Sequence, residues 1–169
     1  MRALGIDPGS RITGWGVVES HRGGFRHVAS GTIVLGSTTS LALRLARLQT
    51  ECGALLIAWV PVAVVLERAF VARNVQSAFR IGEVRGAVLA AVATAGPTLH
   101  EYAPAAVKLA AVGHGRADKD TVARAVAARL GLDRPPPSDA ADALAIALCH
   151  LQQAPLWDAV ARAEGRRGA

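Results

Sequence analysis

The sequence predicts a mixed α/β domain in which helices cover both faces of one central five-stranded sheet. Two patterns indicate this class: three strand-like segments follow one another through short glycine-rich turns, and strands alternate with helices after them. The chain has 169 residues, the length of about one domain. Its 51% hydrophobic and 19% charged residues supply enough apolar surface for a core and exclude a disordered chain.

The first three strands are predicted to form an antiparallel meander. Residues 2–7 form a short apolar run that stops at a Pro-Gly turn, and residues 13–19 and 25–33 form the next two strands. The connections between these segments are short and rich in glycine. Connections of this kind join neighbouring antiparallel strands.

A long amphipathic helix is expected next, over residues 39–59. Its apolar residues recur at spacings of three and four and therefore share one face: Leu41, Leu45, Leu48, Cys52, Leu55 and Trp59. Pro61 ends this helix because proline cannot continue it. The β-branched run over residues 62–67 then predicts a fourth, buried strand.

A second long helix is predicted over residues 75–95, and it carries a stripe of small residues. Ala78, Gly82, Gly86 and Ala90 are each four apart and so lie on one face. Glycine inside a helix costs about 1 kcal/mol relative to alanine, so two glycines suggest that another backbone approaches closely. That backbone belongs either to the sheet of the same chain or to the same helix of a second subunit.

The last part of the chain continues the alternation of strands and helices. We expect a strand at 99–102, a helix from Pro104 to residue 111, a loop at 113–120 leading into a helix that ends at 130, and a last helix at 139–153. The folded domain is therefore expected to span residues 1–153. Residues 154–169 are polar and contain arginine, which predicts a flexible tail.

The charge balance indicates a polyanionic partner. Nineteen Lys and Arg residues face thirteen Asp and Glu residues, a formal net charge of +6. Because the cations are spread along the chain instead of on one amphipathic helix, nucleic acid is favoured over a membrane surface, and solubility alone is the other alternative. Only two cations are lysines, Lys108 and Lys119, which suggests a need for a compact charge at these positions, with chance as the alternative.

Cysteine usage and hydropathy predict a protein of the reducing cytoplasm. No apolar run is long enough for a membrane-spanning helix, and the N-terminus lacks the apolar region of a signal peptide. Cys52 and Cys149 match neither a disulfide framework nor a zinc site. Both lie in helix-like apolar patterns, so buried reduced thiols are expected.

Four acidic residues occupy positions that suggest a metal site. Asp7 and Glu67 each end a predicted strand, and Asp139 and Asp142 lie three apart in the first turn of the last helix. If the two strands are neighbours, their carboxyl ends meet at one edge of the sheet, where ligands bind in α/β proteins. Four close carboxylates need a cation, and oxygen ligands suit Mg²⁺ or Mn²⁺. Two such ions per site could cleave a phosphodiester bond.

Each acid also has a purely structural interpretation. An aspartate in the first turn of a helix stabilises the helix dipole, and an aspartate before Pro-Gly is common in turns. Glu67 is harder to explain in this way, because glutamate is depleted in strands and its neighbours are apolar. The set of four therefore favours a functional site.

Five segments, in this order, resemble the RuvC family of Holliday-junction resolvases over residues 2–151: GIDPGSRITGWGVV, LERAF, EYAPAAVK, VGHGRADKDTV and SDAADALAIAL. The resemblance implies a ribonuclease H-like fold, a homodimer and metal-dependent nicking of four-way DNA junctions in recombination and repair. It also implies a branch-migration complex as a partner. The catalytic and metal-binding acids of the family fall on Asp7, Glu67, Asp139 and Asp142.

The resemblance also suggests residues that contact DNA or a second subunit. The aromatic residue that the family places against junction bases falls on Phe70, and its DNA-facing lysines fall on Lys108 and Lys119. Nearby arginines are candidate phosphate contacts: Arg73, Arg80, Arg85 and Arg116. Family dimers pack through the second long helix, which would explain the stripe formed by Ala78, Gly82 and Gly86.

Three other functions are compatible with parts of this pattern. Asp7-Pro8-Gly9 followed by Gly14 is similar to the first phosphate motif of actin-like ATPases, although these need two such domains and this chain has the length of one. Another ribonuclease H-like nuclease would use similar acids on a different substrate. A junction-binding module without catalysis would not need all four.

Overall fold

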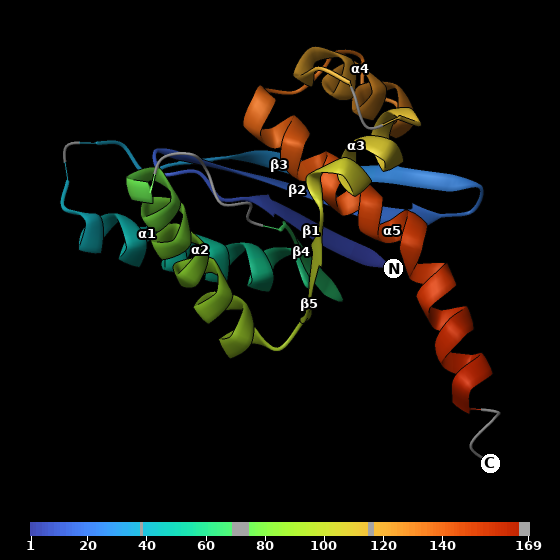
Figure 1. Cartoon of the computed structure of the whole chain (residues 1–169), viewed down its shortest axis with the longest axis horizontal. Coiled ribbons are helices and arrows are strands. Elements are labelled where there is room, and N and C mark those ends of the chain that lie inside the picture. The colour runs from blue at the N-terminus through green and yellow to red at the C-terminus, as the bar shows by residue number, and fades with distance from the viewer. Residues whose placement is uncertain (38, 69–74, 115–116, 166–169) are drawn as a thin grey trace.

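The computed structural model describes residues 1–37, 39–68, 75–114 and 117–165, with residues 155–165 described by their backbone alone. Its centre is a five-stranded sheet of order β3-β2-β1-β4-β5, as Figure 1 shows. The strands are β1 (Arg2–Asp7), β2 (Ile12–His21), β3 (Gly24–Val34), β4 (Ala63–Glu67) and β5 (Thr98–Tyr102). The predicted mixed sheet is therefore confirmed.

The strand order places the carboxyl ends of β1 and β4 side by side. β1 pairs with β2 and β2 with β3 in antiparallel fashion, which is the predicted meander. β4 runs parallel to β1, with Ile6 opposite Leu66, and β5 runs parallel to β4. Asp7 and Glu67 directly follow the paired residues Ile6 and Leu66, so these two acids end adjacent strands.

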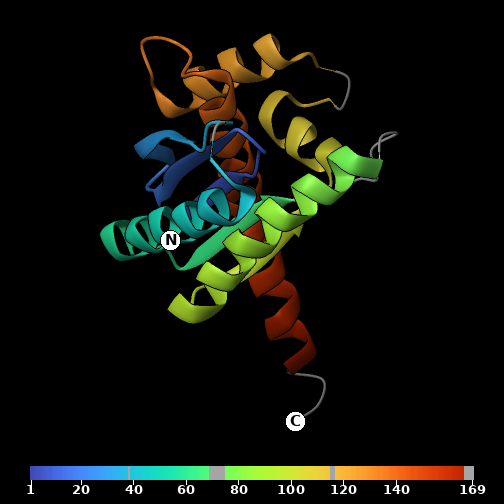
Figure 2. The ribbon, with the colours of Figure 1, turned by 90° about the vertical axis from the view of Figure 1, so that its left-hand side faces the viewer.

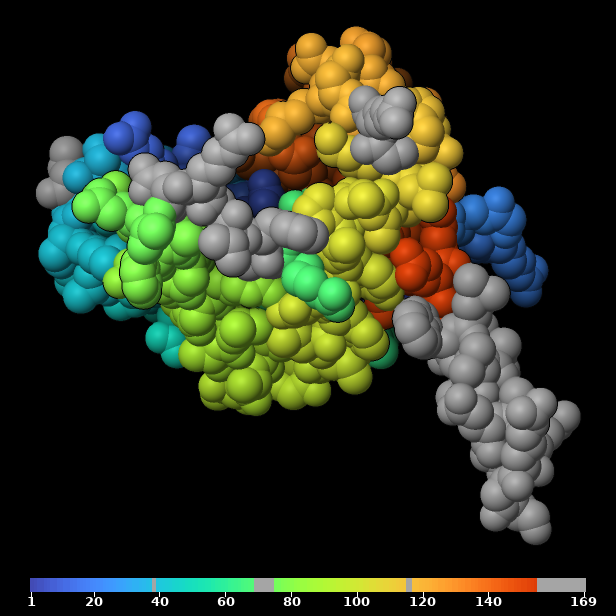
Figure 3. Space-filling view, in the orientation of Figure 1, coloured from blue at the N-terminus to red at the C-terminus, as the bar shows by residue number. Residues whose placement is uncertain are grey.

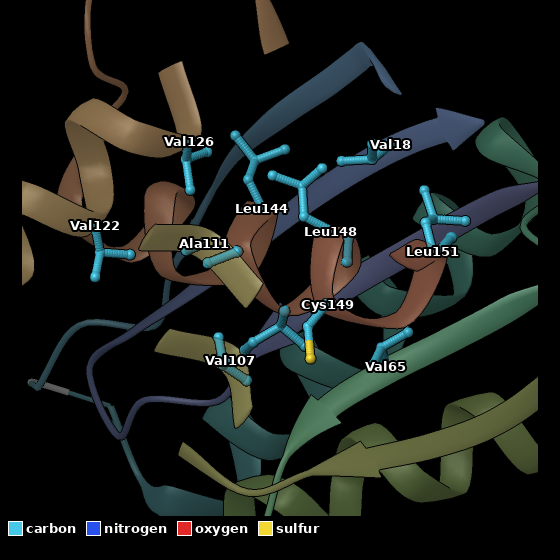
Figure 4. Close-up of a cluster of buried hydrophobic side chains, with 14 of the residues drawn as sticks. Val18, Val65, Val107, Ala111, Val122, Val126, Leu144, Leu148, Cys149 and Leu151 are labelled. Atoms are coloured by element: carbon cyan, nitrogen blue, oxygen red, sulfur yellow. The ribbon is translucent and has the colours of Figure 1, made fainter. Parts of the chain in front are cut away.

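Helices cover both faces of the sheet, and two separate hydrophobic clusters result (Figures 1 and 2). On one face, α1 (Leu41–Trp59) and α2 (Val75–Ala95) pack against each other and cover strand side chains such as Leu4, Val64 and Leu66. On the other face lie α3 (Pro104–Val112), α4 (Lys119–Leu130) and α5 (Ser138–Gly165). Their cluster includes Val65, Leu144 and Leu148, which Figure 4 shows.

The first turns of α5 lie unusually close to the sheet. A Cβ atom added at Gly14 would be 1.9 Å from the Asp139 carbonyl oxygen, and one added at Gly5 would be 2.0 Å from the Ala143 carbonyl oxygen. No residue larger than glycine fits between the helix and these strands. Since Gly14 pairs with Asp7 across β1 and β2, this contact brings the start of α5 beside the end of β1.

The last helix is longer than the sequence pattern predicts. α5 continues to Gly165, twelve residues beyond the expected end at 153, so the predicted end of this helix was wrong. Leucine, alanine, arginine and glutamate predominate between Leu156 and Glu164, and these residues favour helix. The C-terminal part of α5 projects from the body of the molecule in Figure 1. Residues 166–169 lie outside the described chain.

Both cysteines are buried and free, as the sequence predicts. Burial raises the pKa of the Cys52 thiol to about 12 and that of the Cys149 thiol to about 11, so both remain protonated at neutral pH. In the described part of the chain, no helix has the length and apolar character required to cross a membrane.

Candidate active site

Three of the four predicted acids line one pocket at the carboxyl ends of the neighbouring strands β1 and β4. This pocket of about 330 Å³ is bounded by Asp7 of β1, Glu67 of β4 and Asp142 of α5. Two cations complete its polar lining, Lys108 of α3 and Lys119 of α4, and apolar residues form the rest: Pro104, Val107, Val122 and Ala145. Figure 3 shows a hollow there, with dark blue atoms of the N-terminal part of the chain inside it. These apolar residues were not predicted from the sequence, although along the chain they lie close to Lys108, Lys119 and Asp142.

Asp7 has the most perturbed carboxyl group of this pocket. Burial is the largest cause, and the nearby charges of Asp142 and Glu67 add to it; together they raise the pKa of Asp7 from 3.8 to about 6. Lys119 opposes the shift by favouring the charged form. A carboxylate that is costly to ionise because of burial and neighbouring negative charges has a strong electrostatic preference for a bound cation.

Glu67 is perturbed in the same direction and for the same reasons. Burial and the charge of Asp142 raise its pKa, while the charges of Lys108 and Lys119 lower it. The sheet determines the direction of its side chain. Val65 lies in the cluster beneath α5 and Leu66 in the cluster beneath α2, so Glu67 points to the α5 side like Val65.

Asp142 is held by a lysine of the same chain. Lys119 Nζ donates a hydrogen bond to Asp142 Oδ2 at 2.9 Å, and this contact raises the pKa of Lys119. The capping of α4 determines where Lys119 lies. The Asp118 side chain accepts a hydrogen bond from the Thr121 N–H, and Lys119 is the first residue of the helix.

Asp139 lies near this pocket but does not line it. Its main chain packs against Gly14, and its charge makes the smallest contribution to the raised pKa of Asp7. Within the described ranges, no group of three or more His, Cys, Asp or Glu side chains is arranged to hold a metal ion. Three of the four acids therefore converge on one pocket without forming a complete coordination shell, and one of the three, Asp142, is paired with Lys119. The donor chemistry fits Mg²⁺ or Mn²⁺, because all candidate ligands are carboxylate oxygens.

The predicted DNA-contacting residues fall into three groups. Lys108 and Lys119 line the pocket, and Arg80 is exposed on α2. Arg85 is different, because its side chain is only 13% exposed and its guanidinium group is paired with Glu101. The remaining three lie outside the described residues: Phe70, Arg73 and Arg116.

The small-residue stripe of α2 faces away from its own sheet. A Cβ atom added at Gly82 or Gly86 would meet no atom of the described residues within 4 Å, so close packing against this part of the chain is not the reason for these glycines. Val75 and Phe79 extend this face, and Phe79 is 71% exposed. We call the face formed by Val75, Ala78, Phe79 and Gly82 the α2 apolar face. The spacing of Val75, Phe79 and Gly82 could have revealed Val75 and Phe79 from the sequence.

This sheet order, the helices on both faces and the acids at the ends of the two central parallel strands define a ribonuclease H-like α/β fold. The family model described as "Crossover junction endodeoxyribonuclease RuvC" matches residues 3–150. The chain therefore belongs to the RuvC family of crossover junction endodeoxyribonucleases, and the resemblance seen in its motifs is confirmed.

Individual relatives match nearly the whole chain. Crossover junction endodeoxyribonuclease RuvC of Alkalilimnicola ehrlichii is 49% identical over 96% of this chain and 98% of that protein. The RuvC protein of Rhodospirillum rubrum is 46% identical over 99% of this chain and 100% of that protein. The structure of Thermus thermophilus RuvC in complex with a Holliday junction substrate is similar with a TM-score of 0.85 and 34% identity. The matched region covers 92% of this chain and 96% of the Thermus thermophilus chain.

Proposed function

We propose that this protein resolves four-way DNA junctions by paired symmetric nicks, through metal-dependent hydrolysis of phosphodiester bonds, in recombination and repair. One observation supports the proposal most directly. Asp7, Glu67 and Asp142 come from three distant segments and line one pocket together with Lys108 and Lys119. Membership of the RuvC family, and a similar structure described as bound to a Holliday junction substrate, support the choice of substrate.

The four acids share one task in this proposal, which is to bind the metal ions. Asp7, Glu67 and Asp142, which line the pocket, would hold Mg²⁺ or Mn²⁺ together with the nearby Asp139, with two ions per site. The bound ions supply the activation of water and the stabilisation of the leaving oxygen. The raised pKa values of Asp7 and Glu67 support this role, since a cation relieves the mutual repulsion of the carboxylates.

The cations around the pocket bind the phosphate backbone of the junction. Lys108 and Lys119 hold the phosphates next to the scissile bond, and Arg80 contacts the backbone farther away. Phosphate contacts of this kind position the DNA and carry little sequence information. Phe70 stacks on an unpaired junction base, and Arg73 and Arg116 add phosphate contacts, although these three lie outside the described residues. Arg85 is left out of this set, because its guanidinium group is already paired.

The protein acts as a two-fold symmetric homodimer through the α2 apolar face, which includes Ala78 and Gly82, with Gly86 one turn further along. Exposed valine and phenylalanine side chains beside small residues allow two copies of α2 to approach closely. The dimer presents two active sites to two strands of like polarity, which yields symmetric nicks. We place the protein in the cytoplasm and expect it to act together with a branch-migration complex.

A cleavage assay on a synthetic mobile four-way junction tests the function. Matched duplex and single-stranded DNA serve as controls, each with and without Mg²⁺ or Mn²⁺. Paired symmetric nicks that need metal and occur only on the junction are expected. Asp7→Asn is expected to bind the junction and not to cleave it. Equal cleavage of the duplex, or strong residual nicking by this variant, would contradict the proposal.

A further inference from the structure

Arg85 connects α2 with the strand end that carries Glu67. Its Nη1 atom donates a hydrogen bond to the main-chain carbonyl oxygen of Glu67 at 2.8 Å, and its Nη2 atom pairs with Glu101 Oε1. The side chain of Arg85 is 13% exposed, and that of Glu101 is 35% exposed. One guanidinium group therefore joins a helix, the end of β4 and the neighbouring strand β5.

This contact lies on the far side of the sheet from the acid pocket. Tyr102 of β5 belongs to the cluster beneath α5, so Glu101, one residue earlier, points to the α2 side. Val84 and Val88 of α2 pack in the cluster that contains Leu66. Arg85 thus contacts the Glu67 main chain from the α2 side of the sheet, while the Glu67 side chain lines the pocket on the α5 side.

The pairing of β4 with its two neighbouring strands ends at or just before Glu67. On the β1 side the pairing of β4 ends at Leu66, opposite Ile6. On the β5 side it ends at Glu67, opposite Tyr102, and the N–H of Arg68 donates to the Tyr102 carbonyl oxygen at 2.7 Å. A strand end has fewer ladder hydrogen bonds to fix its position, so the hydrogen bond from Arg85 adds a restraint at the residue that carries the carboxylate.

We propose that Arg85 is a positioning residue for Glu67 and that Glu101 holds it in place. The guanidinium group has a planar fork of donors, so it can bond the Glu67 carbonyl and the Glu101 carboxylate together. A rigid carbonyl fixes the backbone from which the Glu67 side chain extends. This inference rests on the proposed function, because it concerns Glu67 as a ligand of the metal ions.

The chain offers a matched control at the opposite end of the sheet. Arg2 Nη1 donates to the Trp59 carbonyl oxygen at 2.7 Å, and Arg2 Nη2 lies 3.5 Å from Glu19 Oε2. This arginine also bridges a main-chain carbonyl and a glutamate, but it lies at the start of β1, away from the pocket. A purely structural role for Arg85 predicts that substitutions at the two arginines have the same consequences.

The test compares Arg85→Met, Arg85→Lys and Glu101→Gln with Arg2→Met in the full-length protein. Mn²⁺ binding to the DNA-free protein is measured by calorimetry, and Tm is measured in EDTA. Junction affinity is measured without divalent ions, and cleavage is followed against Mg²⁺ concentration. Arg85→Met is expected to weaken Mn²⁺ binding and raise the Mg²⁺ half-saturation by about tenfold, the lower end of the usual loss when an outer-shell partner of a metal ligand is removed.

Arg85→Lys keeps the charge and loses the fork, so it is expected to fall between the wild type and Arg85→Met, as is Glu101→Gln. Junction affinity without metal should stay unchanged in all of them. Arg2→Met should lower Tm and leave both metal measurements unchanged. This combination separates positioning of Glu67 from general stability.

Two results would overturn the inference while the proposed function stands. If Arg85→Met and Arg2→Met lower Tm equally and neither changes metal binding, Arg85 has only a structural role. If Arg85→Met weakens junction binding in EDTA and leaves Mn²⁺ affinity unchanged, Arg85 is a phosphate contact. Failure of the proposed function is distinguishable, since the wild type would then show no metal-dependent junction cleavage.

Discussion

Lys119 Nζ lies 2.9 Å from Asp142 Oδ2, so a cation of the chain itself is paired with one of the proposed metal ligands. The lysine is 73% exposed at its side chain and can therefore leave without disturbing the core. In the proposed mechanism the same lysine binds a DNA phosphate. Transfer of Lys119 from Asp142 to the phosphate would leave Asp142 free for a metal ion when DNA binds.

This pairing predicts opposite effects of Lys119→Met on two measurements. Mn²⁺ binding to the DNA-free protein should become severalfold tighter, because the competing ammonium is gone and the pocket is more negative. Junction cleavage should fall, because a phosphate contact is lost. Arg124→Met, on the same helix, should change neither, since Arg124 donates to Thr121 and does not line the acid pocket. Weaker Mn²⁺ binding by Lys119→Met would contradict competition between the lysine and the metal.

The raised pKa of Asp7 predicts that this residue destabilises the metal-free protein at neutral pH. Between 3.8 and about 6 the folded chain holds a proton that the unfolded chain has lost, so stability falls as pH rises through this window. Asp7→Asn removes the effect. Its Tm in EDTA should exceed that of the wild type near neutral pH by a few degrees, at about 2–4 °C per kcal/mol for a chain of this size.

The pH dependence distinguishes this effect from a simple change in packing. The Tm difference between Asp7→Asn and the wild type should shrink as pH falls through about 6 and disappear only below 3.8, where the carboxyl group is protonated in both the folded and the unfolded state. A Tm difference that is constant over this range would show that ionisation of Asp7 is not its cause.

The contact between α5 and β2 predicts that Gly14→Ala damages both stability and activity. The added methyl group would overlap the Asp139 carbonyl, 1.9 Å away, and force the start of α5 from the sheet. Overpacking of this kind costs about 1–3 kcal/mol or more, measured by chemical unfolding. Cleavage should fall further than the loss of folded protein explains, because Asp139 and Asp142 move with the helix.

Gly53→Ala in α1 is the matched control for Gly14→Ala. No atom of the described residues lies within 4 Å of a Cβ atom added at Gly53, and alanine favours helix over glycine. This variant should be stabilised by up to about 1 kcal/mol and retain full activity. Equal destabilisation by both substitutions would mean that the close approach of α5 is not the reason for glycine at position 14.

The α2 apolar face predicts that Phe79→Glu separates the proposed dimer. The side chain is 71% exposed, so the substitution should leave the fold intact and place a charge in the interface. Analytical ultracentrifugation should show a monomer, and symmetric paired nicking should be lost. Ile57→Glu, on α1, changes a side chain that is 81% exposed and should leave the oligomeric state unchanged. A monomeric wild type would contradict the dimer directly.

Local sequence patterns were sufficient to predict the elements of this fold. Alternating and helical periodicity depend on neighbours within a few residues, so the strand ending at Asp7 and the helix from Val75 to Ala95 could be recognised without any partner. The same patterns put Asp7 and Glu67 at strand ends. The end of α5 was mispredicted, because a polar composition does not distinguish a solvated helix from a flexible tail.

Contacts between distant residues were decided by the tertiary structure. The strand order sets Glu67 beside Asp7, which is sixty residues earlier in the chain, and no local pattern encodes that order. No local pattern encodes the hydrogen bond from Lys119 to Asp142 either, or the one from Arg85 to the Glu67 carbonyl oxygen. The sequence alone identified Arg85 only as a positively charged residue. Its burial and pairing with Glu101 depend on how α2 packs on the sheet, because side-chain environment is a property of the packed chain and not of the residue.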